Sequence, residues 1–466
     1  MFDKKPVSLI IFLLSLASRI PALIRPELVL DGDECVLATM AKHAYQAKEL
    51  PIYFWGQNYG FSLIEILFVL PFYAVIGINT LSVKLGMAVL WSLGNVFFYK
   101  TLTGINKENK ALAIILTLIL ITTPAWAEWS IKARGGYITA FTLSNLSTYI
   151  LFQLNIRRYF KYPILGILIA TIYKSQAFWL CGLIPLVAYH IIQEKKYLHL
   201  ATVIVSVLLM SLILASFHYQ GYIVFATNNN GFSSDFHLER LFRFPEYLYK
   251  SVQGNYFLAW YQDTRFFHKL FSKVFVLMVG ILSLSGILHL LFNRKGFGLF
   301  IVSTLFIPLT ICYSILPEDM QGRYMLPVTG YALLSLFIYT QRLRIETFVK
   351  VATAATLALS MGTVIFPVYF NGQTNKKELL ESIAHLKKNG VKYVYATNCM
   401  LPWEYVFYSN EEIKGRMFYF PGRYPQYDTL VDKALYSRER TAVVGYWRDY
   451  AGLDIDSIAI ETHYFI

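Results

Sequence analysis

The chain has 466 residues, of which 56% are hydrophobic and only 15% are charged, and its mean hydropathy is +0.46. These values exclude an ordinary soluble domain, because apolar runs of membrane-spanning length recur along the sequence. The net charge of +13 does not indicate nucleic-acid binding, since the basic residues form short clusters between apolar runs and no continuous stripe. We therefore predict a mostly α-helical, polytopic membrane protein.

The first apolar run follows Lys4 and Lys5 and lacks a convincing small-residue cleavage site, so we expect a retained helix with a cytoplasmic N-terminus. The later basic clusters then all fall on the cytoplasmic side of an alternating path. We predict about eleven spans, an odd number that leaves the C-terminus outside. They are residues 7–29, 80–100, 111–126, 137–155, 162–174, 176–192, 198–217, 272–292, 297–315, 325–341 and 346–368.

The run 61–78 is predicted to be a juxtamembrane or re-entrant helix. A full crossing at this point would place the basic cluster at 100–110 on the external face. Pro71 and Gly77 interrupt the run, and Glu65 is difficult to place in lipid. These features favour a helix that lies at the interface or packs into the bundle.

Three external regions are large enough to hold a site: the loops at residues 30–60 and 218–270, and the tail after Phe370. The first contains the sequence DGDE, residues 31–34, which is predicted to open a helix with Asp31 or Asp33 near its N-cap. Carboxylates at a bilayer edge are costly unless they serve binding or chemistry. The DGDE motif is therefore our first candidate for a functional site.

The region 371–466 is predicted to be a small external α/β domain, after a transmembrane catalytic domain at 1–370. Apolar runs shorten here, and 376–389 has helical spacing that ends at Gly390. Short strands are expected at 391–397, 416–420, 442–446 and 458–464.

DGDE in the first external loop, then FWGQNYGFSLIE and a later GRYMLP, form an arrangement that resembles the polytopic GT-C glycosyltransferases. The resemblance is to the family 39 group, related to protein mannosyltransferases and aminoarabinose transferases, and covers most of residues 7–341. It implies a polyprenyl-phosphate sugar donor and a catalytic base at Asp33, with Glu34 beside it. It also implies substrate-binding positions, at Gln57, Tyr59, Glu65, Arg323 and Tyr324.

Chemistry supports the same site, because moving a sugar from a lipid phosphate to a hydroxyl requires a carboxylate and cations. The carboxylate takes the acceptor proton, and the cations stabilise the departing phosphate. Arg134, Lys174 and Arg323 are predicted at external helix ends, where they could form a phosphate pocket. Arg134 stands in KARGGY, whose glycines allow close approach of backbone to a ligand, and Tyr137 completes the predicted substrate-binding set.

Each of these residues also has a plain structural interpretation. Asp31 or Asp33 can act only as a helix cap, and the cationic side chains can simply reach lipid headgroups. The Asp31-Gly32-Asp33 spacing can hold Mg²⁺ or Mn²⁺ against a phosphate, so a metal cofactor stays open. The four cysteines are predicted to be unpaired thiols, with a disulfide between Cys35 and Cys399 as the alternative.

We therefore expect a GT-C-like integral membrane glycosyltransferase of the bacterial inner membrane, with its site and C-terminal domain on the periplasmic side. Asp33 is the expected base, and Asp31 and Glu34 assist by orientation or metal binding. The expected partners are a polyprenyl-phosphate sugar, a glycan, lipid or protein acceptor, and membrane lipids. The alternatives are a transporter or lipid flippase, for which a helix bundle with a few buried charges also suffices, and an assembly subunit without activity.

Overall fold

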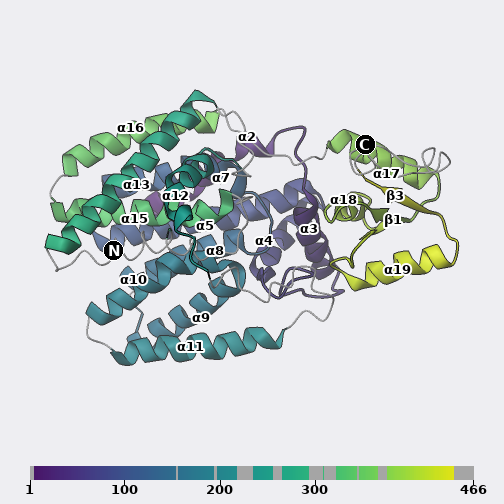
Figure 1. Ribbon diagram of the computed structural model, residues 1–466, viewed down its shortest axis with the longest axis horizontal. Coiled ribbons are helices and arrows are strands. Elements are labelled where there is room, and N and C mark those ends of the chain that lie inside the picture. Colours follow the sequence, from purple (N-terminus) through teal and green to yellow (C-terminus); the bar gives the residue numbers. More distant parts are fainter. Residues whose placement is uncertain are drawn as a thin grey trace.

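The fold is that of a mostly helical membrane bundle with a small α/β unit at one end (Figure 1). The computed structural model describes residues 5–153, 156–193, 197–217, 235–255, 265–292, 308, 322–343, 346–365 and 375–445. The predicted span 297–315, apart from residue 308, and the predicted strand 458–464 lie outside this part of the chain, as does much of the second external loop.

The closest helix packing in the bundle joins helices that are separated in the chain, with α5 against α8 and α9 against α11. In chain order they are α1 (Lys5–Ala17), α2 (Ile20–Leu23), α3 (Gly32–Tyr45), α4 (Leu63–Ile76), α5 (Thr80–Ile105), α6 (Lys110–Thr122), α7 (Pro124–Trp129), α8 (Tyr137–Phe152), α9 (Arg158–Gln176), η1 (Ala177–Trp179), α10 (Leu180–Gln193), α11 (Tyr197–Ser216), α12 (Leu238–Val252), α13 (Phe266–Phe292), η2 (Gly322–Met325), α15 (Leu326–Leu343) and α16 (Glu346–Ile365).

Five helical segments of the described chain are long and apolar enough to cross a membrane, which makes the protein an integral membrane protein. They are Pro6–Leu23, Thr80–Ile105, Tyr159–Ile192, Tyr197–Ser216 and Phe266–Ser285, and three shorter apolar helices accompany them. The predicted count of about eleven spans stays a prediction.

The first span ends earlier than predicted, at Leu23 instead of residue 29. Arg19 interrupts the run: its buried guanidinium donates hydrogen bonds to the carbonyl oxygens of Ile121 and Trp126 and lies 4.3 Å above the Trp91 ring. Farther along, the residue before Pro26 is disfavoured in helical conformation. The chain therefore leaves the helix early and is free to form the extended approach to α3.

The predicted juxtamembrane run is helix α4, which packs against α5 and α3. Its 14 residues cover about 21 Å at about 1.5 Å per residue, less than the hydrocarbon core of about 30 Å. This length favours the juxtamembrane or re-entrant position. Gly77, with φ +82°, ends the helix.

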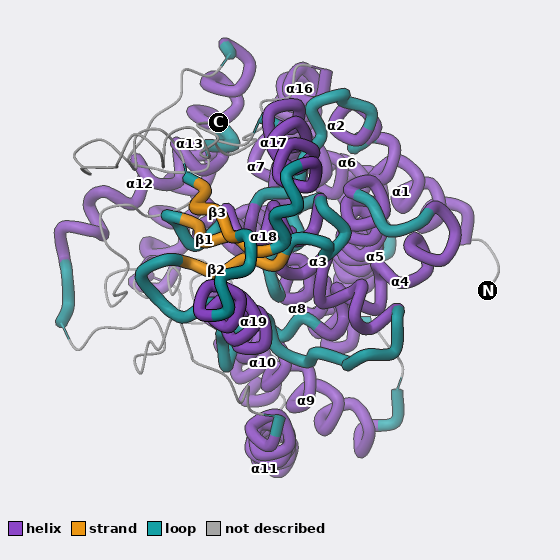
Figure 2. Tube along the Cα trace, turned by 90° about the vertical axis from the view of Figure 1, so that its right-hand side faces the viewer, coloured by secondary structure: helices purple, strands orange, loops and turns teal. Residues whose placement is uncertain are grey.

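The C-terminal α/β unit, residues 375–445, contains a parallel three-stranded sheet in the order β2-β1-β3. One face of the sheet packs on α17 and α18 in a small apolar core, and the other face carries α19 (Figure 2). Two helices of the unit are absent from the sequence prediction, α18 and α19. The elements are α17 (Lys376–Lys388), β1 (Tyr393–Ala396), α18 (Leu401–Tyr408), β2 (Lys414–Met417), α19 (Pro425–Tyr436) and β3 (Thr441–Val444).

The C-terminal α/β unit shares its core with the bundle, because α18 packs along α3. Trp403 and Phe407 of α18 belong to the same apolar cluster as Val36 and Met40 of α3. Gly32 permits the close approach, since a Cβ on Gly32 would lie 2.5 Å from the carbonyl oxygen of Met400. The start of α3 is thus enclosed between the bundle and the C-terminal unit.

Candidate active site at the start of α3

Helix α3 begins at the DGDE motif with a capping box. The Asp31 carboxylate accepts a hydrogen bond from the Glu34 N–H at 3.1 Å, and the Glu34 carboxylate accepts one from the Asp31 N–H at 3.2 Å. Such a pair satisfies backbone donors that the helix itself leaves unpaired. Asp31 is therefore the N-cap that the sequence predicts, and Asp33 stands in the first turn outside the capping box.

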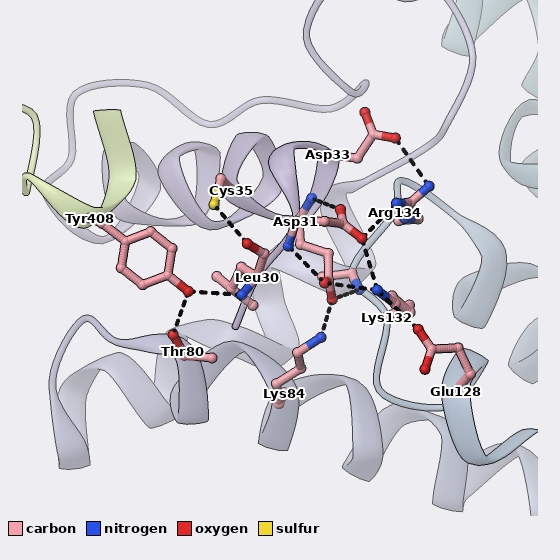
Figure 3. A network of polar contacts seen from close by, with 12 residues as sticks. Leu30, Asp31, Asp33, Cys35, Thr80, Lys84, Glu128, Lys132, Arg134 and Tyr408 are labelled. Atoms are coloured by element: carbon pink, nitrogen blue, oxygen red, sulfur yellow. Dashed lines mark hydrogen bonds and ion pairs between the residues drawn. The ribbon is translucent and has the colours of Figure 1, made fainter. Parts of the chain in front are cut away.

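Asp31, Glu34, Lys84, Glu128 and Lys132 form what we call the buried layer (Figure 3). Glu34 is 0% exposed and pairs with Lys84 of α5. The Nζ atom of Lys132 lies 2.8 Å from Oδ2 of Asp31 and 3.0 Å from Oε1 of Glu128. Because a buried charge without a counter-charge is strongly destabilising, this alternation of carboxylates and ammonium groups allows them to stay inside the protein.

Asp31 is held in the buried layer as an ionised carboxylate. Its burial would raise its pKa, but Arg134 and Lys132 beside it hold the pKa well below its usual range. Nη2 of Arg134 lies 2.6 Å from Oδ2 of Asp31. The oxygens of Asp31 thus serve a helix cap and two cations, which is an orienting role.

Asp33 is the most exposed acid of the motif. Its side chain is 15% exposed, compared with 10% for Asp31 and 0% for Glu34. Two guanidinium groups flank its carboxylate: Nη1 of Arg134 lies 3.3 Å from Oδ2, and Nη2 of Arg423 lies 2.9 Å from Oδ1. In Figure 3, Asp33 reaches Arg134 from the side opposite to the buried layer.

Tyr59, in the loop between α3 and α4, is 39% exposed, and a Cβ on the next residue, Gly60, would lie 3.0 Å from the carbonyl oxygen of Gly135. Partial burial and the neighbouring Tyr324 raise its pKa, whereas Arg423 and Arg323 act in the opposite direction. Tyr59 is next in the chain to a residue that touches the turn carrying Arg134. We call Asp33, Tyr59, Arg134, Arg323 and Arg423 the entrance group.

Arg323 is held by aromatic rings. Its guanidinium carbon lies 4.8 Å from the centre of the Tyr137 ring and 5.2 Å from that of Tyr324. Arg323 also lies 5.8 Å from the Trp129 ring, which Arg134 approaches to 5.9 Å. The shared indole brings both guanidinium groups to one side of the site, where stacking leaves their edges able to donate hydrogen bonds.

Glu65 occupies a supporting position behind Arg134. It is 0% exposed, and its carboxylate accepts hydrogen bonds from the N–H groups of Gly135 at 3.0 Å and Gly136 at 2.8 Å. Both glycines have positive φ, and a Cβ on Gly135 would lie 2.8 Å from the Phe54 ring. Glu65 therefore fixes the turn that carries Arg134.

Lys174 and Gln57 stand apart from the carboxylates in the contacts that the structure describes. Nζ of Lys174 lies 5.9 Å from the centre of the Tyr53 ring, and its carbonyl oxygen accepts the N–H of Phe61. Gln57 donates its N–H to the carbonyl oxygen of Phe54 within the first external loop. Of the three predicted phosphate-binding cations, Arg134 and Arg323 share the Trp129 ring, whereas Lys174, near the end of α9, approaches the Tyr53 ring.

The sequence prediction omits Lys84, Glu128, Lys132 and Arg423. Lys84 near the start of an apolar span, and Lys132 two positions before Arg134, carry a recognisable signal, because ionisable residues at membrane depth are rarely incidental. No feature of the sequence indicates that Arg423 belongs to the site, since it is 390 positions from Asp33 in the chain. Only folding of the C-terminal α/β unit onto α3 brings it to the site.

The described cysteines Cys35, Cys181 and Cys399 form no disulfide, so the alternative pairing of Cys35 with Cys399 is absent from this structure. Within the described residues no group of three His, Cys, Asp or Glu suits a metal ion. Asp31 and Asp33 each already bind a guanidinium group, so a divalent ion at this pair would lie close to Arg134. In this arrangement Arg134 binds both carboxylates of the DxD spacing, and a metal cofactor stays a prediction.

Fold and site together define an integral membrane protein with the fold of the GT-C glycosyltransferases. The chain is similar to the aminoarabinose transferase ArnT from Cupriavidus metallidurans in the apo state, with a TM-score of 0.60 and 12% identity over 96% of this chain and 93% of that one. This likeness confirms the resemblance seen in the sequence at the level of the fold.

Two further solved structures match at 12% identity. ArnT from Cupriavidus metallidurans bound to undecaprenyl phosphate gives a TM-score of 0.48, over 96% of this chain and 86% of that one. The oligosaccharyltransferase of Archaeoglobus fulgidus in complex with Zn and sulfate gives 0.49, over 89% and 62%. No family model and no curated protein sequence matches the chain.

Proposed function

We propose that this protein is a membrane glycosyltransferase that transfers a sugar from a polyprenyl-phosphate donor to an acceptor hydroxyl. The reaction takes place on the external, periplasmic face of a bacterial inner membrane, with the N-terminus in the cytoplasm. The observation that carries the proposal is the entrance group: one partly exposed carboxylate, Asp33, stands among arginines at the start of α3.

Asp33 is the proposed general base. The acceptor oxygen attacks the anomeric carbon of the sugar, and its proton passes to the Asp33 carboxylate. Attack opposite the departing phosphate inverts the configuration at that carbon. Asp31 and Glu34 are unsuited to this step, because the capping box and the buried layer occupy their oxygens.

Arg134 and Arg323 are the proposed phosphate-binding residues. As the bond from the anomeric carbon to the phosphate oxygen breaks, its electron pair remains on the phosphate, which leaves as polyprenyl phosphate. Preorganised guanidinium groups stabilise this charge as it develops. Asp31 and the turn held by Glu65 fix Arg134, and the Tyr137 and Tyr324 rings fix Arg323.

Tyr59, Tyr324 and Gln57 are the proposed contacts to the sugar or the acceptor. Tyr59 is 39% exposed beside Asp33, so its ring and hydroxyl are available to a substrate. Lys174 lies beside Tyr53 in the first external loop, where its charge would act on the donor at longer range. Glu65 acts through Arg134 and is a positioning residue.

A lipid-linked donor agrees with the fold comparison. ArnT, whose apo structure shares this fold at a TM-score of 0.60, has also been crystallised bound to undecaprenyl phosphate. Candidate site residues lie at the end of the bundle that meets the C-terminal α/β unit (Figure 1). A transporter would instead keep its ionisable residues near mid-bilayer on broken helices.

The test is sugar transfer by the purified full-length protein from a radiolabelled polyprenyl-phosphate hexose to candidate glycan, lipid and protein acceptors. We expect radioactivity to pass to an acceptor and polyprenyl phosphate to be released in equal amount. Parallel reactions with a chelator, and with added Mg²⁺ or Mn²⁺, test the metal hypothesis. Folded protein that transfers sugar from no such donor would favour the transporter.

A further inference from the structure

We propose that Arg423 of the C-terminal α/β unit is a further phosphate-binding residue, which exchanges the Asp33 carboxylate for the donor phosphate. In this structure its guanidinium binds Asp33. In the reacting complex it turns to the phosphate, which releases an oxygen of Asp33 for the acceptor proton. This inference rests on the proposed function and extends it, since it gives the external unit a direct part in the reaction.

Arg423 lies inside the site although it belongs to the C-terminal unit. It is 4% exposed, and its Nη2 lies 2.9 Å from Oδ1 of Asp33. Its guanidinium carbon lies 5.0 Å from the centre of the Phe54 ring, and Nη1 donates to the carbonyl oxygen of Trp55 at 3.5 Å. Its partner Asp33 is the most exposed acid of the DGDE motif, with a side chain that is 15% exposed.

The first external loop holds the backbone of Arg423 firmly against the bundle. Gly56 has φ +75°, and a Cβ there would lie 3.0 Å from Cγ of Arg423, so the glycine makes room for the arginine stem. The next residue, Tyr424, stacks on Trp55 with ring centres 4.2 Å apart and planes 24° from parallel. The stem is thus anchored, and only the guanidinium end needs to turn.

Arg134 and Arg423 bind opposite oxygens of Asp33, but their positions differ in kind. Arg134 is also tied to Asp31 at 2.6 Å, and Glu65 holds its turn. Arg423 comes from a separate unit and approaches Oδ1, whereas Arg134 approaches Oδ2. Withdrawal of Arg423 therefore frees an oxygen of the base without disturbing the buried layer.

A phosphate is a suitable new partner for this guanidinium, because arginine binds phosphate oxygens in a planar, two-point fashion. With Arg423 on the phosphate, the acceptor O–H gives its proton to Oδ1 of Asp33 as the new C–O bond forms. The old bond breaks, and its electron pair departs on the phosphate beside Arg423. Donor binding and release of the base are then one event.

The experiment measures binding of radiolabelled polyprenyl phosphate to the purified full-length protein in lipid nanodiscs. Arg423→Gln is compared with Arg423→Lys, Asp33→Asn and the double variant Asp33→Asn, Arg423→Gln. Arg440→Gln is the matched control, since this arginine of the same unit hydrogen-bonds to Asn389 and carries an equal charge. Thermal unfolding of each variant confirms that it is folded.

We expect Arg423→Gln to weaken binding about 10- to 100-fold, Arg423→Lys to weaken it less, and Arg440→Gln to leave it unchanged. Asp33→Asn should tighten binding about 10-fold where Arg423 is present, and much less in the double variant. Such a dependence would show that Asp33 and the phosphate compete for Arg423. With a purely structural contact, the effect of Asp33→Asn on phosphate binding would not depend on residue 423.

Wild-type-like binding by folded Arg423→Gln, or equal tightening by Asp33→Asn with and without Arg423, would overturn the inference. If Arg423→Gln fails to fold, Arg423→Lys decides: binding equal to wild type counts against the exchange, and weaker binding supports it. In both cases the wild-type protein still binds polyprenyl phosphate and transfers sugar. Loss of the proposed function itself looks different, since the wild-type protein would then do neither.

Discussion

The buried layer and the entrance group use the same residue types in opposite ways. Asp31 and Glu34 are enclosed among Lys84, Lys132 and Arg134, and their oxygens serve helix capping and charge balance. Asp33, between them in sequence, is partly exposed and meets arginines from two distant parts of the chain. The first turn of α3 thus holds two structural carboxylates and the carboxylate that we propose as the base.

This difference shows that the acids of one motif at a membrane edge can have different roles, which have to be assigned residue by residue. In a capping box, the side chains of the N-cap residue and of the third residue after it turn back to the backbone. The side chains of the two residues between them point elsewhere. The spacing that makes a capping box at Asp31 and Glu34 therefore frees Asp33. The predictions below test that division, from the largest effect to the smallest.

Asp33→Asn should reduce kcat of sugar transfer by about 10²- to 10⁴-fold, because the base is lost while the volume of the side chain is kept. The unfolding midpoint should fall by less than that of Glu34→Gln, since the buried layer is untouched and the amide oxygen introduced at position 33 can still accept a hydrogen bond from Arg423. Glu27→Gln is a matched control, an acid with 62% exposure that pairs with Arg25 outside the site. Transfer by Asp33→Asn at the rate of the control would remove Asp33 from the chemistry.

Glu34→Gln should lower the free energy of unfolding by about 3–5 kcal/mol, because it leaves the Lys84 ammonium buried without its counter-charge. Denaturant unfolding in detergent measures the loss. The double variant Glu34→Met, Lys84→Met should recover much of it, since it removes both charges together. A single variant as stable as the wild type would mean that the layer does not hold the site.

Arg323→Gln should raise KM for the donor about 10-fold, because one guanidinium of the entrance group is lost. Lys174→Gln should change KM much less, since Lys174 approaches the Tyr53 ring and no contact that the structure describes joins it to Asp33. Initial rates over a range of donor concentrations separate the two. A larger effect at Lys174 than at Arg323 would contradict the division between them.

His43 at the end of α3 gives the smallest effect and a pH dependence. It contacts Glu411 of the C-terminal unit at 2.9 Å and Glu49 at 3.1 Å. Burial alone would lower the pKa of His43, but hydrogen bonds to the two carboxylates raise it above its usual value. Lys42, Lys48 and Tyr427 also face Glu411.

A raised pKa in the folded state contributes stability that is complete below about pH 6.5, the unfolded value, and is lost as pH rises through the folded value. His43→Gln should therefore lower the free energy of unfolding by about 1.5 kcal/mol at pH 5.5 and by less at pH 9. Denaturant unfolding at the two pH values measures the gap. A difference in the free energy of unfolding between wild type and His43→Gln that is larger at pH 9 than at pH 5.5 would contradict this prediction.

Local pattern alone predicts much of the bundle and the start of the site. The apolar runs at 80–100, 137–155 and 198–217 each became a helix, because length and hydropathy decide membrane helices. The Asp-x-x-Glu spacing at 31–34 is likewise sufficient for the capping box. A predicted helix end was wrong where one buried polar residue interrupts an apolar run, as Arg19 does in the first run.

The partners of the acidic motif could not be predicted, because they depend on packing between distant segments. Lys84 reaches Glu34 from another helix, and Arg423 reaches Asp33 only after the C-terminal unit has docked. Lys174 looked equivalent to Arg134 and Arg323 by position in the topology. In the structure Lys174 approaches the Tyr53 ring, whereas Arg134 and Arg323 share the Trp129 ring, and no charge pattern along the chain indicates this difference.

The most direct test of the central claim is thiol labelling at residue 33. Asp33→Cys is introduced into a protein whose Cys35, Cys181, Cys312 and Cys399 are replaced by Ala, with that parent as control. A membrane-impermeant thiol reagent is applied to sealed vesicles of either orientation, with and without polyprenyl phosphate. We predict labelling from the periplasmic side only, slowed by polyprenyl phosphate. Labelling from the cytoplasmic side, or no protection by the lipid, would contradict the account.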